Sequence, residues 1–153
     1  MKINKVTLLL SVLSVILFSG CSTGTTVPLE PKEISKNAKF FNIPPENKAG
    51  LYVYRDKSTG VAAERDIWID NECLGRASNK VFFYQSIEGN KKYKLSTESE
   101  FSANSISLKT KSGKNYYVRQ YIKTGLFVGG ANLEIVEEAK AKKGLCNKPH
   151  ITD

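Results

Sequence analysis

From Leu51 onward, apolar and polar side chains alternate with a period of two rather than the 3.6 of a helix. The alternation is cleanest over residues 92–97 and 105–110, where apolar residues and threonine face one side and lysine and serine face the other. This pattern is typical of half-buried antiparallel strands. Further strands are predicted over residues 51–55, 66–70, 73–76, 81–84, 115–122, 126–128 and 133–136. About eight short strands at regular spacing predict an all-β fold, a small antiparallel β-sandwich.

Turn and helix signals interrupt this pattern at two places. Asp70-Asn71 resembles the two-residue turn of a hairpin joining the strands on either side. Residues 137–143 predict a short C-terminal helix, because Glu138 and Lys142 have the spacing of an i,i+4 ion pair and Gly144 is a typical stop. The residues after this helix are expected to form a loose tail, unless Cys146 fastens them.

The first 20 residues predict an export signal. Lys2 and Lys5 form a positive segment, and the apolar run over residues 6–18 is shorter than the roughly 20 residues of a membrane span. Leu17-Phe18-Ser19-Gly20-Cys21 resembles the lipobox of bacterial lipoproteins, although Phe18 replaces the usual aliphatic residue. The resemblance implies that Cys21 becomes the N-terminus and carries a diacylglycerol and an amide-linked acyl chain such as palmitate. More than one acyl chain is needed for durable anchoring.

The residue after the acylated cysteine bears on the destination. Ser22 rather than aspartate follows Cys21, which in double-membrane bacteria implies transfer to the outer membrane, here with the domain facing the periplasm. Residues 22–49 contain four of the five prolines and predict a stiff tether, on which Phe40, Phe41 and Ile43 are apolar enough to dock on the domain. The predicted organisation is a signal at 1–20, a lipidated tether at 21–49, a sandwich domain at 50–140 and a tail at 141–153.

Net charge points to anionic partners. Removing residues 1–20 lowers the basic residues from 23 to 21 against 15 acidic ones, so the mature chain carries about +6. Such a surplus favours lipid headgroups or an anionic glycolipid such as lipopolysaccharide, and the compartment argues against nucleic acid. A solvated, lysine-rich surface is the alternative interpretation.

The other two cysteines lie in a compartment where disulfides persist. A bridge between Cys73 and Cys146 would close a long loop and contribute about 4 kcal/mol in the loop-entropy model. Two free thiols are the alternative.

Catalytic and metal chemistry find little support in the sequence. The single histidine, His150, lies three residues from the end, and a zinc site built from Cys73, Cys146 and His150 would lack a close-spaced ligand pair. Asp66 and Asp70 share a strand face but lie about 13 Å apart, beyond the roughly 5–9.5 Å of glycosidase carboxyls. We therefore predict no enzyme, no metal and no cofactor.

One constellation suggests a ligand surface. Tyr117, Arg119 and Tyr121 share one face of a predicted strand, and they point outward if Val118 points into the core. Aromatic rings beside a guanidinium can stack on a sugar or bind an anion, and Arg55 lies beside two tyrosines on another strand. The alternative is structural: cross-strand tyrosine packing, with Arg119 paired to a carboxylate on a neighbouring strand.

The order of several segments resembles a known family. The segments are Gly50-Leu-Tyr-Val-Tyr-Arg55, Ile67-Trp-Ile-Asp70, Phe82-Phe83-Tyr84, Gly113-Lys114-Asn-Tyr-Tyr-Val-Arg119 and Leu133-Glu-Ile-Val136. Over about residues 48–140 they resemble domain-of-unknown-function family 2846, which contains bacterial lipoproteins. The resemblance implies a β-sandwich similar to transthyretin-like or carboxypeptidase-regulatory-like modules, and it carries over no catalytic residue. The expected function is a lipid-anchored, non-catalytic envelope module that contacts another envelope protein. The alternative is a binding domain for an anionic glycan or lipid.

Overall fold

The computed structural model describes residues 31–55, 64–78, 81–99, 102–123, 130–146 and 150–152. Two helices and nine strands occur within these ranges. They are α2 (Lys32–Ala38), β1 (Lys48–Arg55), β2 (Arg65–Ile69), β3 (Glu72–Ala77), β4 (Val81–Glu88), β5 (Lys92–Thr97), β6 (Asn104–Lys109), β7 (Lys114–Lys123), β8 (Gly130–Val136), α3 (Glu138–Cys146) and β9 (His150–Thr152). Cys21 and the predicted strand at 126–128 lie outside the described residues.

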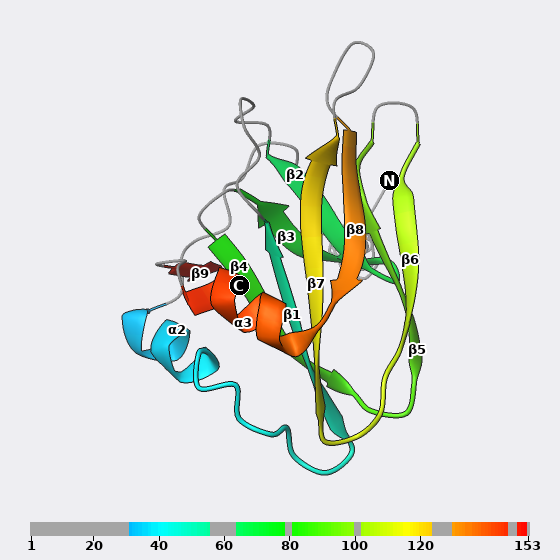
Figure 1. Ribbon diagram of the computed structural model, residues 1–153. Helices are drawn as coiled ribbons and strands as arrows, with labels where there is room; N and C mark the ends of the chain where they lie inside the picture. Colours follow the sequence, from blue (N-terminus) through cyan, green and yellow to red (C-terminus); the bar gives the residue numbers. More distant parts are fainter. Residues whose placement is uncertain are drawn as a thin grey trace, which may run out of the picture.

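The strands form two packed sheets, which confirms the predicted sandwich (Figure 1). One sheet has five strands in the order β8-β7-β1-β4-β9, and the other has four in the order β3-β2-β5-β6. The four-stranded sheet is antiparallel throughout. The five-stranded sheet is mixed, because β1 pairs with β7 and β4 pairs with β9 in parallel. The expectation of a purely antiparallel sandwich is therefore wrong for these two pairs.

The main core lies between the sheets. It is made by the apolar residues at alternate positions of both sheets, including Leu51, Val53, Ile67, Phe83, Leu95, Leu108 and Val118. A polar link crosses this core: Gln120 Nε2 on β7 donates to Thr97 Oγ1 on β5 at 2.7 Å, and Thr97 Oγ1 donates to the carbonyl of Asp66 at 2.8 Å. Buried polar groups stay tolerable when they are paired in this way.

The outer face of the five-stranded sheet carries a second apolar layer. Tyr52, Tyr54, Phe82, Tyr117 and Val136 form a cluster with Ala38 of α2 and with Ala141 and Leu145 of α3. The predicted C-terminal helix is confirmed, with bounds shifted to Glu138–Cys146. In Figure 1 both helices lie outside this sheet, with α3 crossing in front of it and α2 beside β9. The outer face is therefore covered rather than open to solvent.

The folded unit extends beyond the predicted boundaries at both ends. Helix α2 begins directly after Pro31, so the segment 32–49 is structured and is not a tether. At the other end, β9 pairs in parallel with Val81–Phe83 of β4, so the predicted loose tail includes an edge strand. The expected docking of three apolar residues is correct for Phe41 alone, because Phe40 and Ile43 stay 60% and 82% exposed.

The hairpin between β2 and β3 forms at Asp70-Asn71 as predicted. Asp70 has a positive φ of 51°, a conformation that aspartate and asparagine tolerate better than most residues. Its carboxylate accepts a hydrogen bond from the Lys94 backbone N–H at 2.8 Å, and its own N–H donates to the Lys94 carbonyl at 2.7 Å. Asp70 is therefore a turn residue that fastens the hairpin to β5.

Candidate functional site

The predicted tyrosine and arginine stripe does lie on the outward side of β7. Val118 points into the core with no exposed surface, as the alternation requires. Tyr117, however, is 2% exposed, because Phe41 and the helices cover it. Arg119 and Tyr121 are half-buried. The stripe is therefore mostly internal, and the prediction that it forms an open ligand surface is wrong for Tyr117.

Tyr117 belongs to a packed aromatic group on this outer face. Tyr52 lies at its centre: its ring centroid is 5.2 Å from that of Tyr117, 4.7 Å from Tyr84 and 5.3 Å from Phe41. Aromatic pairs at these separations stabilise beyond the area they bury. Burial, reinforced by the Glu138 carboxylate, raises the pKa of Tyr117 to about 12. Burial also raises the pKa of Tyr52, so both phenols are neutral at ordinary pH.

Arg119 has the structural partner that the alternative interpretation expects. Its Nη2 lies 2.6 Å from Glu134 Oε2, and the two residues are directly opposed in the β7–β8 ladder. The guanidinium also lies 5.1 Å from the Tyr121 ring centroid. A cross-strand pair of this kind contributes to sheet stability, which explains Arg119 without a ligand.

Arg55 lies between the two sheets and is 1% exposed. Its Nη1 donates to the Ala77 carbonyl on β3 at 3.1 Å, so it links β1 to the opposite sheet. Burial, and to a lesser degree the neighbouring Arg65, lowers the pKa of Arg55. A side chain in this position cannot meet a ligand at the surface, and the prediction for Arg55 is also wrong.

The predicted Cys73–Cys146 bridge is absent, because Cys146 is a free, exposed thiol at the end of α3. The fold gives the reason: Cys73 lies on β3 of the four-stranded sheet, whereas α3 packs on the far side of the five-stranded sheet. No group of three or more His, Cys, Asp or Glu side chains that could hold a metal ion occurs among the described residues. Asp66 is engaged by Arg76, whose Nε lies 2.8 Å from Asp66 Oδ1.

A pocket of about 430 Å³ opens at one end of the sandwich, between the β2–β3 and β4–β5 turns. Its charged lining mixes both signs, with Lys48 and Lys91 against Asp70, Glu72 and Glu88. Lys91 and Glu88 pair at 3.2 Å. No local pattern in the sequence indicates this pocket, because its residues come from five strands, β1 to β5, and from the turns that join them. A lining of mixed charge does not favour an anion or a cation.

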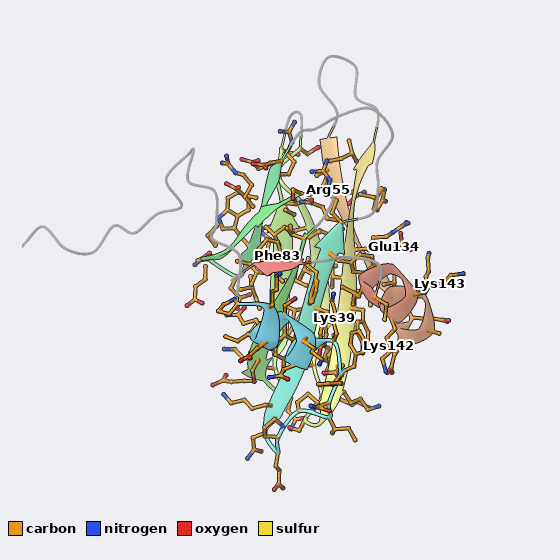
Figure 2. All side chains as sticks on the ribbon, turned by 90° about the vertical axis from the view of Figure 1, so that its left-hand side faces the viewer. Lys39, Arg55, Phe83, Glu134, Lys142 and Lys143 are labelled. Atoms are coloured by element: carbon orange, nitrogen blue, oxygen red, sulfur yellow. The ribbon has the colours of Figure 1, made fainter. Side chains whose placement is uncertain are left out.

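The feature that sequence reasoning missed is the face formed by α2, residues 39–43 and α3, which we call the helical face. Three of the five large apolar side chains exposed among the described residues lie there: Ile34, Phe40 and Ile43. In Figure 2, which labels Lys39, Lys142 and Lys143, α2 lies toward the viewer and α3 lies at the right-hand side. The lysines of the helical face are Lys32, Lys36, Lys39, Lys140, Lys142 and Lys143. Exposed apolar groups and lysines therefore occur together on one side of the molecule.

The segment after α2 is held firmly. Phe41 adopts a positive φ of 51°, which turns its ring onto Tyr52 and Tyr117 while Phe40 and Ile43 stay exposed. Asn115 Nδ2 donates to the carbonyls of Phe41 at 3.2 Å and Asn42 at 3.0 Å. Gly50 makes room for this amide, since a Cβ at position 50 would collide with Asn115 Oδ1. The backbone strain at Phe41 is offset by these contacts.

These observations define the class: a small β-sandwich with a helical layer over one sheet. No helix among the described residues is both long enough and apolar enough to cross a bilayer. The chain belongs to the protein family of unknown function DUF2846, whose profile matches residues 45–131. It is similar to an uncharacterized protein of Haemophilus influenzae strain Rd, with 47% identity over 130 residues, which is 85% of this chain and 75% of the relative. The family expected from the sequence is therefore confirmed.

Proposed function

We propose that this protein is a lipid-anchored, non-catalytic module of the bacterial envelope, delivered to the outer membrane and facing the periplasm. The observation that carries the proposal is the segment Leu17–Cys21, which resembles a lipobox and is followed after ten residues by the first helix of the folded domain. In this proposal the acylated Cys21 holds the domain at the membrane, and the domain contacts another envelope component.

The structural roles of the polar residues support a non-catalytic function. Arg55 and Arg119 hold strands and sheets together, Asp70 makes a turn, and Asp66 pairs with Arg76. A nucleophile is activated by a base that a third group orients. The residues that chemistry would first suggest in this chain are instead engaged in packing and turns.

The anchor is tested by replacing the acceptor. Native protein should partition into the detergent phase, and its N-terminal peptide should carry the mass of the acyl groups on Cys21. Cys21→Ala should remain in the aqueous phase. Detergent partitioning of Cys21→Ala equal to the native protein contradicts the anchor. Crosslinking in the envelope followed by pull-down tests the interaction role, with Cys21→Ala as the mislocalised control.

A second function, binding of an anionic glycan or lipid, keeps support from one observation. Six lysines lie on the helical face, whereas the predicted tyrosine and arginine stripe is mostly buried. Lipid-overlay binding, including lipopolysaccharide, tests it, and Lys32→Gln/Lys36→Gln should weaken binding while Arg119→Ala should not.

A further inference from the structure

The start of the fold limits how far the domain can lie from its anchor. Ten residues, 22–31, separate Cys21 from Lys32, the first residue of α2. A fully extended chain of ten residues spans at most about 35 Å, and a flexible one spans about 17 Å on average. If Cys21 is acylated, α2 is therefore the element of the sandwich nearest to the bilayer along the chain.

The exposed apolar side chains gather in the same place. Ile34 is 50% exposed, Phe40 60% and Ile43 82%, and all three lie within ten residues of one another. Single exposed apolar residues are normal on protein surfaces. A group of large ones directly downstream of a lipid anchor is the arrangement expected of residues that enter the headgroup region of a membrane.

The charge of the helical face complements an anionic membrane. Residues 32–43 and 138–146 together contain six lysines and two glutamates. Within the described residues, Lys142 pairs with Glu138, and Lys140 Nζ lies 3.8 Å from Glu134 Oε1. The face keeps a positive balance. A lysine near an anionic lipid surface strengthens adsorption about fivefold.

The face is already formed before any membrane contact. The Tyr52 hydroxyl donates to the carbonyl of Ala38, the last residue of α2, at 2.9 Å. The Phe41 ring and the two hydrogen bonds from Asn115 fix the segment that follows. The Lys142 ammonium lies 5.0 Å from the Phe41 ring centroid, which ties α3 to the same segment. A membrane would meet a preorganised surface and would not have to order it.

We propose that the helical face lies flat on the anionic phospholipid surface that carries the anchor. Ile34, Phe40 and Ile43 enter the headgroup boundary, and Lys32 and Lys36 face lipid phosphates. The four-stranded sheet then faces away from the bilayer and is left for other partners. This inference rests on the proposed acylation of Cys21 for its location, but the chemistry of the face itself is independent of the anchor.

The test is hydrogen exchange of the native, acylated protein in vesicles of two compositions. One set contains phosphatidylethanolamine with phosphatidylglycerol, and the other contains phosphatidylcholine alone. Amides of residues 32–43 should exchange about fivefold more slowly in the anionic vesicles, because the helical face is held on the surface. Amides of β5 and β6, on the opposite sheet, should exchange equally in both.

Two pairs of matched variants sharpen the result. Lys32→Gln/Lys36→Gln should abolish the difference between the two vesicles, whereas Lys92→Gln/Lys94→Gln, an equal charge change on β5, should preserve it. Phe40→Ser/Ile43→Ser changes only exposed side chains and should also reduce the protection. Comparing the vesicles within each variant removes any effect on folding. Equal exchange of residues 32–43 in both vesicles for the native protein overturns the proposal.

The experiments distinguish a failure of the proposed acylation of Cys21 from a failure of the proposed membrane contact of the helical face. If mass spectrometry shows an unacylated Cys21, the proposed function fails. The unacylated protein is then tested for flotation with phosphatidylglycerol vesicles. Flotation that Lys32→Gln/Lys36→Gln abolishes supports the helical face, and no flotation overturns it.

Discussion

The two outer faces of this sandwich are built from strands of similar length and yet have opposite chemistry. The five-stranded sheet presents aromatic residues outward, and α2 and α3 cover them. The four-stranded sheet presents lysines and serines, which remain mostly exposed: Lys92, Lys94, Ser105, Ser107 and Lys109. A sheet face that carries Tyr52, Phe82 and Tyr117 needs a cover, since burying a large aromatic side chain contributes about 1.5–3 kcal/mol. The helical cover therefore has a structural purpose, and within the described residues it also creates a face that combines lysines with exposed apolar residues.

The largest effect on the free energy of unfolding is expected from a substitution that disrupts the packing of the helical layer on the five-stranded sheet. Leu145 of α3 is completely buried against the aromatic layer. Leu145→Ala should lower the free energy of unfolding by about 2–4 kcal/mol, because it removes apolar contacts and leaves a cavity. Urea unfolding measures this. Lys94→Ala, on the open face, should change stability by less than about 0.5 kcal/mol. Equal losses in the two variants would show that the helical layer adds nothing to stability.

A smaller effect is expected from loosening α2 alone. Tyr52→Phe keeps the ring but removes the hydrogen bond to the Ala38 carbonyl. The free energy of unfolding should fall by about 1 kcal/mol, and amides of α2 should exchange faster. Tyr84→Phe is the matched control on the same aromatic group, and it should leave α2 unchanged. If α2 exchanges at the native rate in Tyr52→Phe, the hydroxyl does not hold the helix.

The buried phenols predict a loss of stability at alkaline pH. The pKa of Tyr117 rises from 10.0 to about 12 on folding, so the folded state holds this proton more tightly than the unfolded state. The stabilisation is fully present below pH 10 and is lost as pH rises toward about 12. Tyr117→Phe should make stability less dependent on pH in this window. Urea unfolding across the window measures the slope, and an unchanged slope in Tyr117→Phe contradicts the burial argument.

The smallest effect is expected where the covered face meets solvent. The Arg119–Glu134 pair is only half-buried, so a double-mutant cycle with Arg119→Ala and Glu134→Ala should give a coupling energy of about 0.5 kcal/mol. Added salt should reduce it. A coupling of several kcal/mol would mean that the pair is more deeply desolvated than its exposure indicates.

The strands and the sandwich could be predicted because a period of two directly reports one buried face. The cover could be predicted only in part. Helix α3 has the predicted Glu138–Lys142 charge pair, although the predicted stop at Gly144 is wrong because the helix continues to Cys146. Helix α2 is seven residues long with only Ser35 and Ala38 buried, so it lacks the apolar stripe that marks a helix. The sequence indicates α2 only indirectly. Strand β1 is apolar on both faces, and each apolar face needs another element packed against it.

The candidate site was missed for a related reason. Alternation correctly placed Tyr117 on the side of β7 opposite Val118, but it does not say whether another element covers that side. Arg55 lies inside because successive side chains of β1 point to opposite faces of the sheet, and position 55 falls on the inner face. The two tyrosines beside it made this inner position hard to recognise in the sequence. Pairings such as β1 with β7 join segments far apart in the chain, and no local pattern reports them.

In the proposed orientation, the helical face lies on the membrane and the four-stranded sheet points away. This orientation is tested most directly by photocrosslinking in living cells, with benzoylphenylalanine replacing Phe40 in one strain and Lys94 in another. We expect phospholipid adducts from position 40 and none from position 94. Adducts to phospholipid at both positions alike, or adducts to protein alone at position 40, would contradict it.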